Sequence, residues 1–198
     1  MVMMIEAMPL ETLAALVNEW GTAPRVADGR GGQAYPNCAG MAERLAGLMP
    51  VSAVLTEREL AETADRLHPV FAAPDLAERA RLIAALLTDT AVRPTVRTMT
   101  DRLQPGWFVE ASGNAVLASA AITLRQYLSD HSAERLGLCT GRRCADVYID
   151  ASPGGRRRFC SVTCQNRARV AAFRSRQTEE TSRTTASRTT RAPRTDGS

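Results

Sequence analysis

Four cysteines near the C-terminus have the residue type and the spacing of a metal site. They form two close pairs separated by a loop, in the order Cys139-x4-Cys144-x15-Cys160-x3-Cys164. This pattern is typical of a zinc ion bound by four thiolates in a tetrahedron. Four protein ligands leave no position open for a catalytic water. The sequence therefore predicts one Zn²⁺ with a structural role, and no enzyme.

The residues between the cysteines predict the elements that hold the metal. Gly141 permits a ligand-bearing turn, and Pro153-Gly154-Gly155 is a turn signal. We expect strands at 147–149 and 157–159, followed by a helix that Ser161 caps and that carries Cys164 in its first turn. The predicted module is a small treble-clef-like ββα unit.

Arginines surround the cysteines and extend along the predicted helix. On a helical wheel, Val162, Val170 and Phe173 share a face that we expect to pack on the hairpin, and arginine rows flank a stripe of small side chains elsewhere. Guanidinium groups bind phosphate in a bidentate way, which favours DNA as the partner and leaves RNA open. The alternative is a solvated arginine-rich helix. The candidate nucleic-acid-binding residues are Arg156, Arg157, Arg158, Arg167, Arg169, Arg174 and Arg176.

The charge of the chain is divided unevenly. Residues 1–138 carry 12 Arg and 16 acidic residues, a net charge of −4, whereas residues 139–198 carry 13 Arg and 5 acidic residues, a net charge of +8. The overall charge of +4 therefore hides a basic C-terminal part suited to an anionic partner.

The N-terminal part has the periodicity of a mostly α-helical domain. Apolar residues recur at helical spacing, and Thr56-x-x-Glu59 is a capping-box signature. We predict a loop over 21–36 and a short β-hairpin formed by 93–99 and 106–110. The predicted helices span 7–20, 38–49 (capped by Asn37), 56–68, 74–88 and 114–129.

These observations predict three regions and a cytoplasmic location. Residues 1–130 form the helical domain, residues 136–176 the zinc module, and residues 177–198 a disordered tail that lacks large apolar side chains. No basic leader or apolar run of membrane-spanning length is visible. Because disulfides are rare in the cytoplasm, that location favours metal binding by the four cysteines.

The segment around the last two cysteines resembles the CGNR-type zinc finger. The run that gives that family its name reads Cys164-Gln165-Asn166-Arg167 here, with Gln in place of Gly. In that family the finger follows a helical domain called ABATE, and Val17-Asn18 resembles an early element of that domain. The resemblance implies a stress-induced bacterial transcription regulator that binds DNA, in which residues 1–130 sense a signal or form a homodimer.

Other candidate residues are interpreted as structural. Cys38 is expected to be a small buried residue, with a redox-sensing thiol as the alternative, and His68 and His131 are expected near helix ends. Asp146 and Asp150 are interpreted as scaffolding of the zinc module. Two further functions remain open: an adaptor that docks on an acidic surface of the transcription machinery, and a redox switch that releases zinc.

Overall fold

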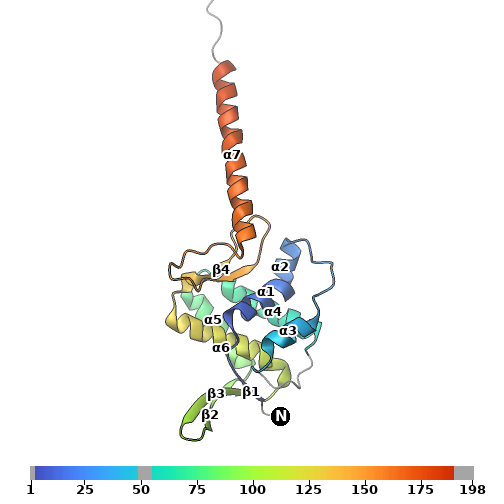
Figure 1. Ribbon diagram of the computed structural model, residues 1–198, viewed down its shortest axis with the longest axis vertical. Coiled ribbons are helices and arrows are strands. Elements are labelled where there is room, and N and C mark those ends of the chain that lie inside the picture. Colours follow the sequence, from blue (N-terminus) through green and yellow to red (C-terminus); the bar gives the residue numbers. More distant parts are fainter. Residues whose placement is uncertain (1–2, 49–54, 190–198) are drawn as a thin grey trace, which may run out of the picture. The chain divides into compact units, whose positions relative to one another are not determined.

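The computed structural model describes the backbone of residues 3–48 and 55–189 and the side chains as far as residue 178. Two compact units make up the chain, Met1–Cys160 and Ser161–Ser198. The first unit is mostly helical, with small strand pairs (Figure 1). Its helices are α1 (Leu10–Trp20), α2 (Thr22–Ala27), α3 (Cys38–Leu45), α4 (Glu57–Ala72), α5 (Leu76–Asp89) and α6 (Ala115–Asp130). Its strands are β1 (Met3–Ile5), β2 (Arg93–Thr98), β3 (Leu103–Val109), β4 (Leu136–Leu138) and β5 (Val147–Ile149), with short 3₁₀ turns at Ser112–Asn114 and Ala133–Arg135.

Local capping signals in the sequence fix several helix starts. The side chain of Asn37 accepts a hydrogen bond from the backbone N–H of Ala39, and Thr56 and Glu59 form the predicted reciprocal capping box. Each cap satisfies backbone N–H groups that have no partner within their helix. The predicted helix starts at 38 and near 56 are therefore confirmed.

The sheet of the first unit has the order β1-β3-β2, and both pairs are antiparallel. The predicted hairpin corresponds to β2 and β3, which pair from Arg93 opposite Phe108 to Thr98 opposite Leu103. Strand β1 was not predicted. Its three residues are too few for a period of two to be visible, and its partner β3 lies about a hundred residues later in the chain.

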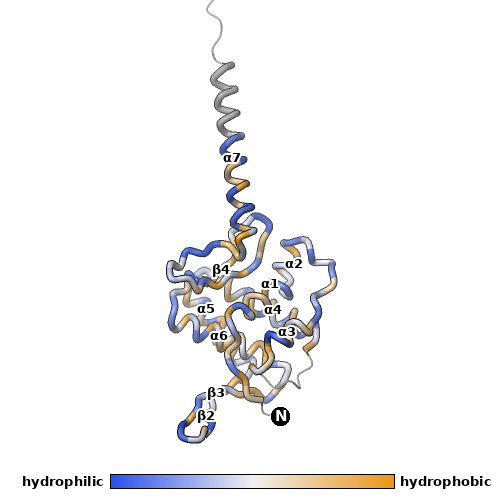
Figure 2. Tube along the Cα trace, in the orientation of Figure 1, coloured by the Kyte–Doolittle hydropathy of each residue, from blue (hydrophilic) through white to orange (hydrophobic). Residues whose placement is uncertain are grey.

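The core of the first unit lies between the helices (Figure 2). Trp20 is completely buried, whereas Trp107 is only partly buried against the core. The strands β4 and β5 belong to the same core, since Leu136, Val147 and Ile149 are buried with the helical residues. The cysteine-bearing strand pair is thus packed on the helices of its own unit.

Several boundaries predicted for the helical part differ from the structure; for example, the helix expected over 38–49 ends at Leu45. The segment 21–36 was expected to be a loop, but α2 occupies Thr22–Ala27. Pro24 lies in the first turn of α2, where its missing N–H costs no hydrogen bond. Helix α4 was expected to end near 68, yet it continues to Ala72 with Pro69 inside it.

In the second unit, α7 spans Val162–Thr189. The helix was expected to end near 176 and to be followed by the disordered tail. It continues as far as Thr189 because residues 177–189 contain no Gly or Pro to interrupt it. The remainder of the predicted tail, residues 190–198, lies outside the described residues.

Candidate metal centre and arginine surface

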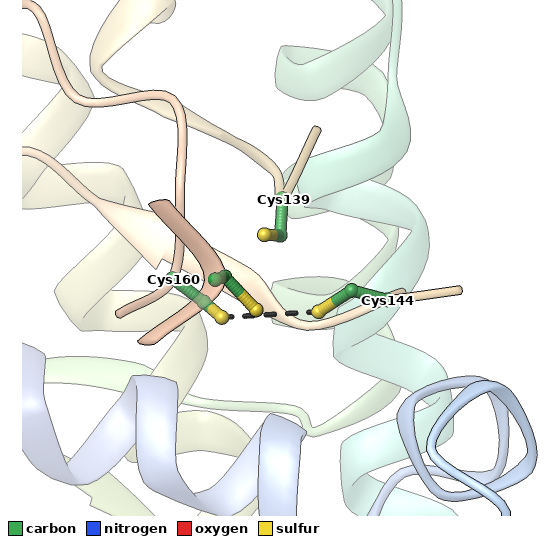
Figure 3. Close-up of side chains that lie close together, drawn as sticks. Cys139, Cys144 and Cys160 are labelled. Atoms are coloured by element: carbon green, nitrogen blue, oxygen red, sulfur yellow. Dashed lines mark hydrogen bonds between the residues drawn. The ribbon is translucent and has the colours of Figure 1, made fainter. Parts of the chain in front are cut away.

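The four predicted zinc ligands come together in the structure. The sulfur atoms of Cys139, Cys144, Cys160 and Cys164 all lie within 4.8 Å of one another. Figure 3 shows the side chains of Cys139, Cys144 and Cys160 converging, with Sγ of Cys144 3.8 Å from Sγ of Cys160. Zn–S bonds of about 2.3 Å in a tetrahedron place sulfur atoms about 3.8 Å apart. The four cysteines can therefore hold one zinc ion.

The strand pair β4–β5 positions the first two ligands. Cys139 directly follows β4, and its backbone N–H donates to the carbonyl of Asp146, 2.8 Å away. This bond extends the ladder in which Leu138 lies opposite Val147. Between the two ligands, Arg143 adopts a positive φ of 57° that closes the turn. The backbone N–H of Gly141 points at Sγ of Cys139 at 3.4 Å, which stabilises a thiolate there.

The predicted pairing of the zinc module's strands is wrong. Strand β5 was expected to pair with 157–159, but it pairs with β4, and residues 157–159 are not a strand. Gly137 permits the observed pairing, because a Cβ atom at that position would lie 2.8 Å from the Tyr148 hydroxyl. The predicted turn at 153–155 is present, and Gly155 adopts the left-handed φ of 57° there.

Asp150 holds the loop that leads to the third ligand. Its carboxylate is 2% exposed and accepts hydrogen bonds from the hydroxyl and N–H of Ser152 and from the N–H of Arg157, at 2.5, 3.0 and 2.7 Å. The hydroxyl of Ser152, and then the N–H of Arg157, lower the pKa of this carboxyl group. Asp150 is therefore an ionised scaffold of the loop, in agreement with its predicted role.

Arg157 also belongs to this scaffold. Its guanidinium group donates to the carbonyl oxygens of Phe159 at 2.9 Å, Ile149 at 3.3 Å and Cys160. The carbonyl of Arg158 accepts from both the N–H and the hydroxyl of Thr140, each at 3.0 Å, which ties this loop to the first ligand turn. Arg157 was predicted to contact phosphate, but its donors are directed at the ligand loop.

The ionisation of the cysteines differs between positions. Burial raises the pKa of the Cys139 thiol, but hydrogen bonds from the N–H groups of Cys160 and Gly141 outweigh it and lower the pKa overall. Burial, together with the charges of Asp146 and Cys139, raises the pKa of Cys144 to about 12. Full ionisation of the cluster therefore requires the compensating charge of a bound cation.

Helix α7 carries the fourth ligand as predicted. The hydroxyl of Ser161 accepts from the N–H of Cys164 at 3.2 Å, and the carbonyl of Ser161 accepts from the N–H of Gln165 at 3.1 Å. Ser161 thus caps the helix, and Cys164 lies in its first turn. Helix α7 continues without interruption through Gln165, the residue that stands where the resembled motif has Gly.

The side chains of α7 are more exposed than expected. Val162, Val170 and Phe173 were predicted to pack on the hairpin, but they are 70, 49 and 55% exposed. The helical wheel identifies a face that is apolar, and it does not show whether a neighbour covers that face. The candidate arginines of the helix, which are Arg167, Arg169, Arg174 and Arg176, are all exposed, as are Arg156, Arg157 and Arg158 before it.

The remaining residues considered in the sequence, Cys38, His68 and His131, lie apart from the four clustered cysteines in sequence. Cys38 is half-buried against the core of the first unit. His131 ends α6 as expected, whereas His68 lies within α4 and its Nε2 is 3.0 Å from the carbonyl oxygen of Ala145. Sequence analysis missed Arg135, which donates to the carbonyls of Asp150 and Ser152 and so supports the ligand loop. No spacing signal marks such a residue.

None of the helices in the described ranges combines the length and apolarity needed to cross a bilayer. Comparison with protein families shows that residues 135–177 match the CGNR zinc finger. The match contains all four cysteines and the candidate arginines Arg167, Arg169, Arg174 and Arg176, and it does not extend into residues 1–130. No curated protein matches the chain closely enough to count as a relative.

Proposed function

We propose that this protein is a bacterial, cytoplasmic transcription regulator that binds DNA through its zinc-organised C-terminal part. The observation that carries this proposal is the exposure of arginines on α7, next to a four-cysteine cluster within a CGNR zinc finger match. The net charge of +8 over residues 139–198 supports an anionic partner. A cytoplasmic location would keep the four thiols reduced and available to the metal.

In this proposal the metal maintains the structure and the arginines make the contacts to DNA. Zinc would be structural, because four thiolates close its coordination shell and exclude a catalytic water. Exposed guanidinium groups of α7 would bind phosphates, and one or two of them would reach base edges. The direct phosphate contacts in this proposal are Arg156, Arg158, Arg167, Arg169, Arg174 and Arg176.

Residues 1–130 would serve as a sensor or a dimerisation domain. The Val17-Asn18 resemblance to the ABATE domain supports this role, as does a helical core that forms its own compact unit with the cysteine-bearing strands. In a regulator, a signal bound by such a domain would change the affinity of the basic part for DNA.

The test is the Cys160→Ser variant, with Cys38→Ser as the matched control. We expect Cys160→Ser to lose zinc and DNA binding together, because three ligands cannot hold the ion as tightly and α7 loses its anchor at Cys164. Cys38 is the one cysteine of the chain outside the cluster, so Cys38→Ser should keep both properties. Zinc content by elemental analysis and binding to labelled duplexes measure the outcome. Full DNA binding by zinc-free Cys160→Ser would contradict the proposal.

The exposed apolar face of α7 favours a second candidate function. Val162, Val170 and Phe173 lie on one side of the helix between arginines, as in a helix that docks on an acidic protein groove. In that case the chain would be an adaptor of the transcription machinery. If a Val170→Ser/Phe173→Ser double variant still binds DNA, the adaptor is not the main function. A protein partner that co-purifies in stoichiometric amount, together with a lack of DNA affinity, would support the adaptor.

A further inference from the structure

The side chain of Asn18 in α1 clamps the backbone of β5. Its Nδ2 donates to the carbonyl oxygen of Val147 at 3.1 Å, and its Oδ1 accepts from the N–H of the same residue at 2.7 Å. The carboxamide thus pairs with both backbone polar groups of Val147, as a neighbouring β-strand would. The two residues are 129 positions apart in the chain.

Three further helices hold the same segment in the same way. In each case a side chain of the helical part bonds to a backbone carbonyl of residues 133–150. The contacts are His68 of α4 with Ala145 at 3.0 Å, Arg79 of α5 with Ala133 and with Leu136 at 3.0 Å, and Tyr127 of α6 with Asp150 at 2.8 Å. Both Arg79 and Tyr127 are buried, so these bonds are shielded from water.

Fixing β5 also fixes the first two metal ligands. Val147 lies three residues after Cys144 and opposite Leu138, which directly precedes Cys139. The ladder continues through the bond from Cys139 N–H to Asp146. A clamp on Val147 therefore determines where both ends of the ligand turn lie, without contributing a ligand itself.

We propose that Asn18 is a positioning residue for the zinc centre and couples zinc binding to the stability of the helical part. The clamp holds the first ligand turn in its binding geometry before the metal arrives, which raises zinc affinity. By thermodynamic reciprocity, bound zinc strengthens the clamp and protects α1 from opening. This inference rests on the metal site and is independent of DNA binding.

The first test compares Asn18→Ala with Ser119→Ala in the full-length protein. Ser119 is a suitable control because its buried hydroxyl also donates to a distant carbonyl, that of Glu6 at 2.6 Å, but away from the cysteines. Titration against a chromophoric chelator measures zinc affinity. We expect Asn18→Ala to weaken zinc binding roughly 10-fold and Ser119→Ala to leave it unchanged. Unchanged affinity in Asn18→Ala, or an equal loss in both variants, would overturn the proposal.

A second test uses the unmodified protein, so it does not depend on the folding of any variant. Hydrogen exchange is measured with and without zinc. We expect zinc to slow exchange in α1 and to leave the β2–β3 hairpin unaffected, since none of the clamping side chains comes from the hairpin. Zinc protection confined to residues 136–176, with none in α1, would refute the coupling even if zinc binds tightly.

Discussion

The arginines near the cysteines differ in role, although their side chains are chemically the same. Arg157 and Arg174 are both exposed, but Arg157 directs its donors at carbonyl groups of the ligand loop, whereas Arg174 lies on α7. A sequence rich in arginine cannot distinguish the two roles, because the difference depends on which carbonyl groups the fold brings near each guanidinium group. The structure therefore separates Arg157, which supports the ligand loop, from the other candidate arginines.

This division predicts opposite behaviour of two alanine variants. Arg157→Ala should weaken zinc binding roughly 10- to 100-fold, because it removes hydrogen bonds that orient the ligand loop. Arg174→Ala should leave zinc affinity unchanged and reduce the slope of log affinity for DNA against log salt by about one. Chelator competition and salt titrations provide the two measurements. Normal zinc affinity in Arg157→Ala would remove Arg157 from the scaffold.

Asp150 predicts a pH dependence of stability. Its pKa is lowered in the folded protein, so its contribution is complete above the ordinary carboxyl pKa of about 3.9 and is lost as pH falls through the lowered value. Asp150→Asn should cost about 1–3 kcal/mol at neutral pH, because an amide cannot accept all three hydrogen bonds. The cost should shrink in acid. Urea unfolding at several pH values, with chelator present throughout, measures it; a cost that is constant with pH would contradict this role.

Among the elements, those defined by local signals were predictable from sequence. The caps at Asn37, Thr56 and Ser161 were identified correctly, because a cap and its partner lie within three residues of one another. The pairing of β5 with β4 and the hydrogen bonds from Asn18 to β5 were not predicted, because each depends on which distant segments meet in the fold. The metal ligands were predictable because their residue type and spacing suffice, whereas their supports, such as Arg135, carry no such pattern.

The exposed apolar face of α7 leads to a prediction about stability. Phe173 is 55% exposed, so Phe173→Ala should change the free energy of unfolding by less than about 0.5 kcal/mol. A phenylalanine packed in a core, as the helical wheel suggested, would cost about 3–5 kcal/mol. Chemical denaturation of the zinc-loaded protein distinguishes the two. A loss in the larger range would show that the apolar face of α7 is covered in solution.

For the whole molecule, positive charge is concentrated toward the C-terminus: residues 1–138 carry a net charge of −4 and residues 139–198 a net charge of +8, while the two compact units divide after Cys160. The helical unit also contains the strands that carry the first ligand turn, and the second unit is built on the arginine-bearing helix. Four cysteines bring sulfur atoms from both parts of the sequence within the reach of one ion. A zinc ion would thereby make the structure of the basic part dependent on the metal, and the proposed DNA binding should depend on it too.

The most direct test of this account is selection of bound fragments from a random DNA pool by the zinc-loaded protein at near-physiological salt. The account predicts an enriched sequence motif that Cys160→Ser no longer selects and that an excess of unrelated RNA does not displace. No enrichment, with binding that fades equally for all sequences as salt rises, would contradict a sequence-specific regulator and leave only a phosphate-binding surface.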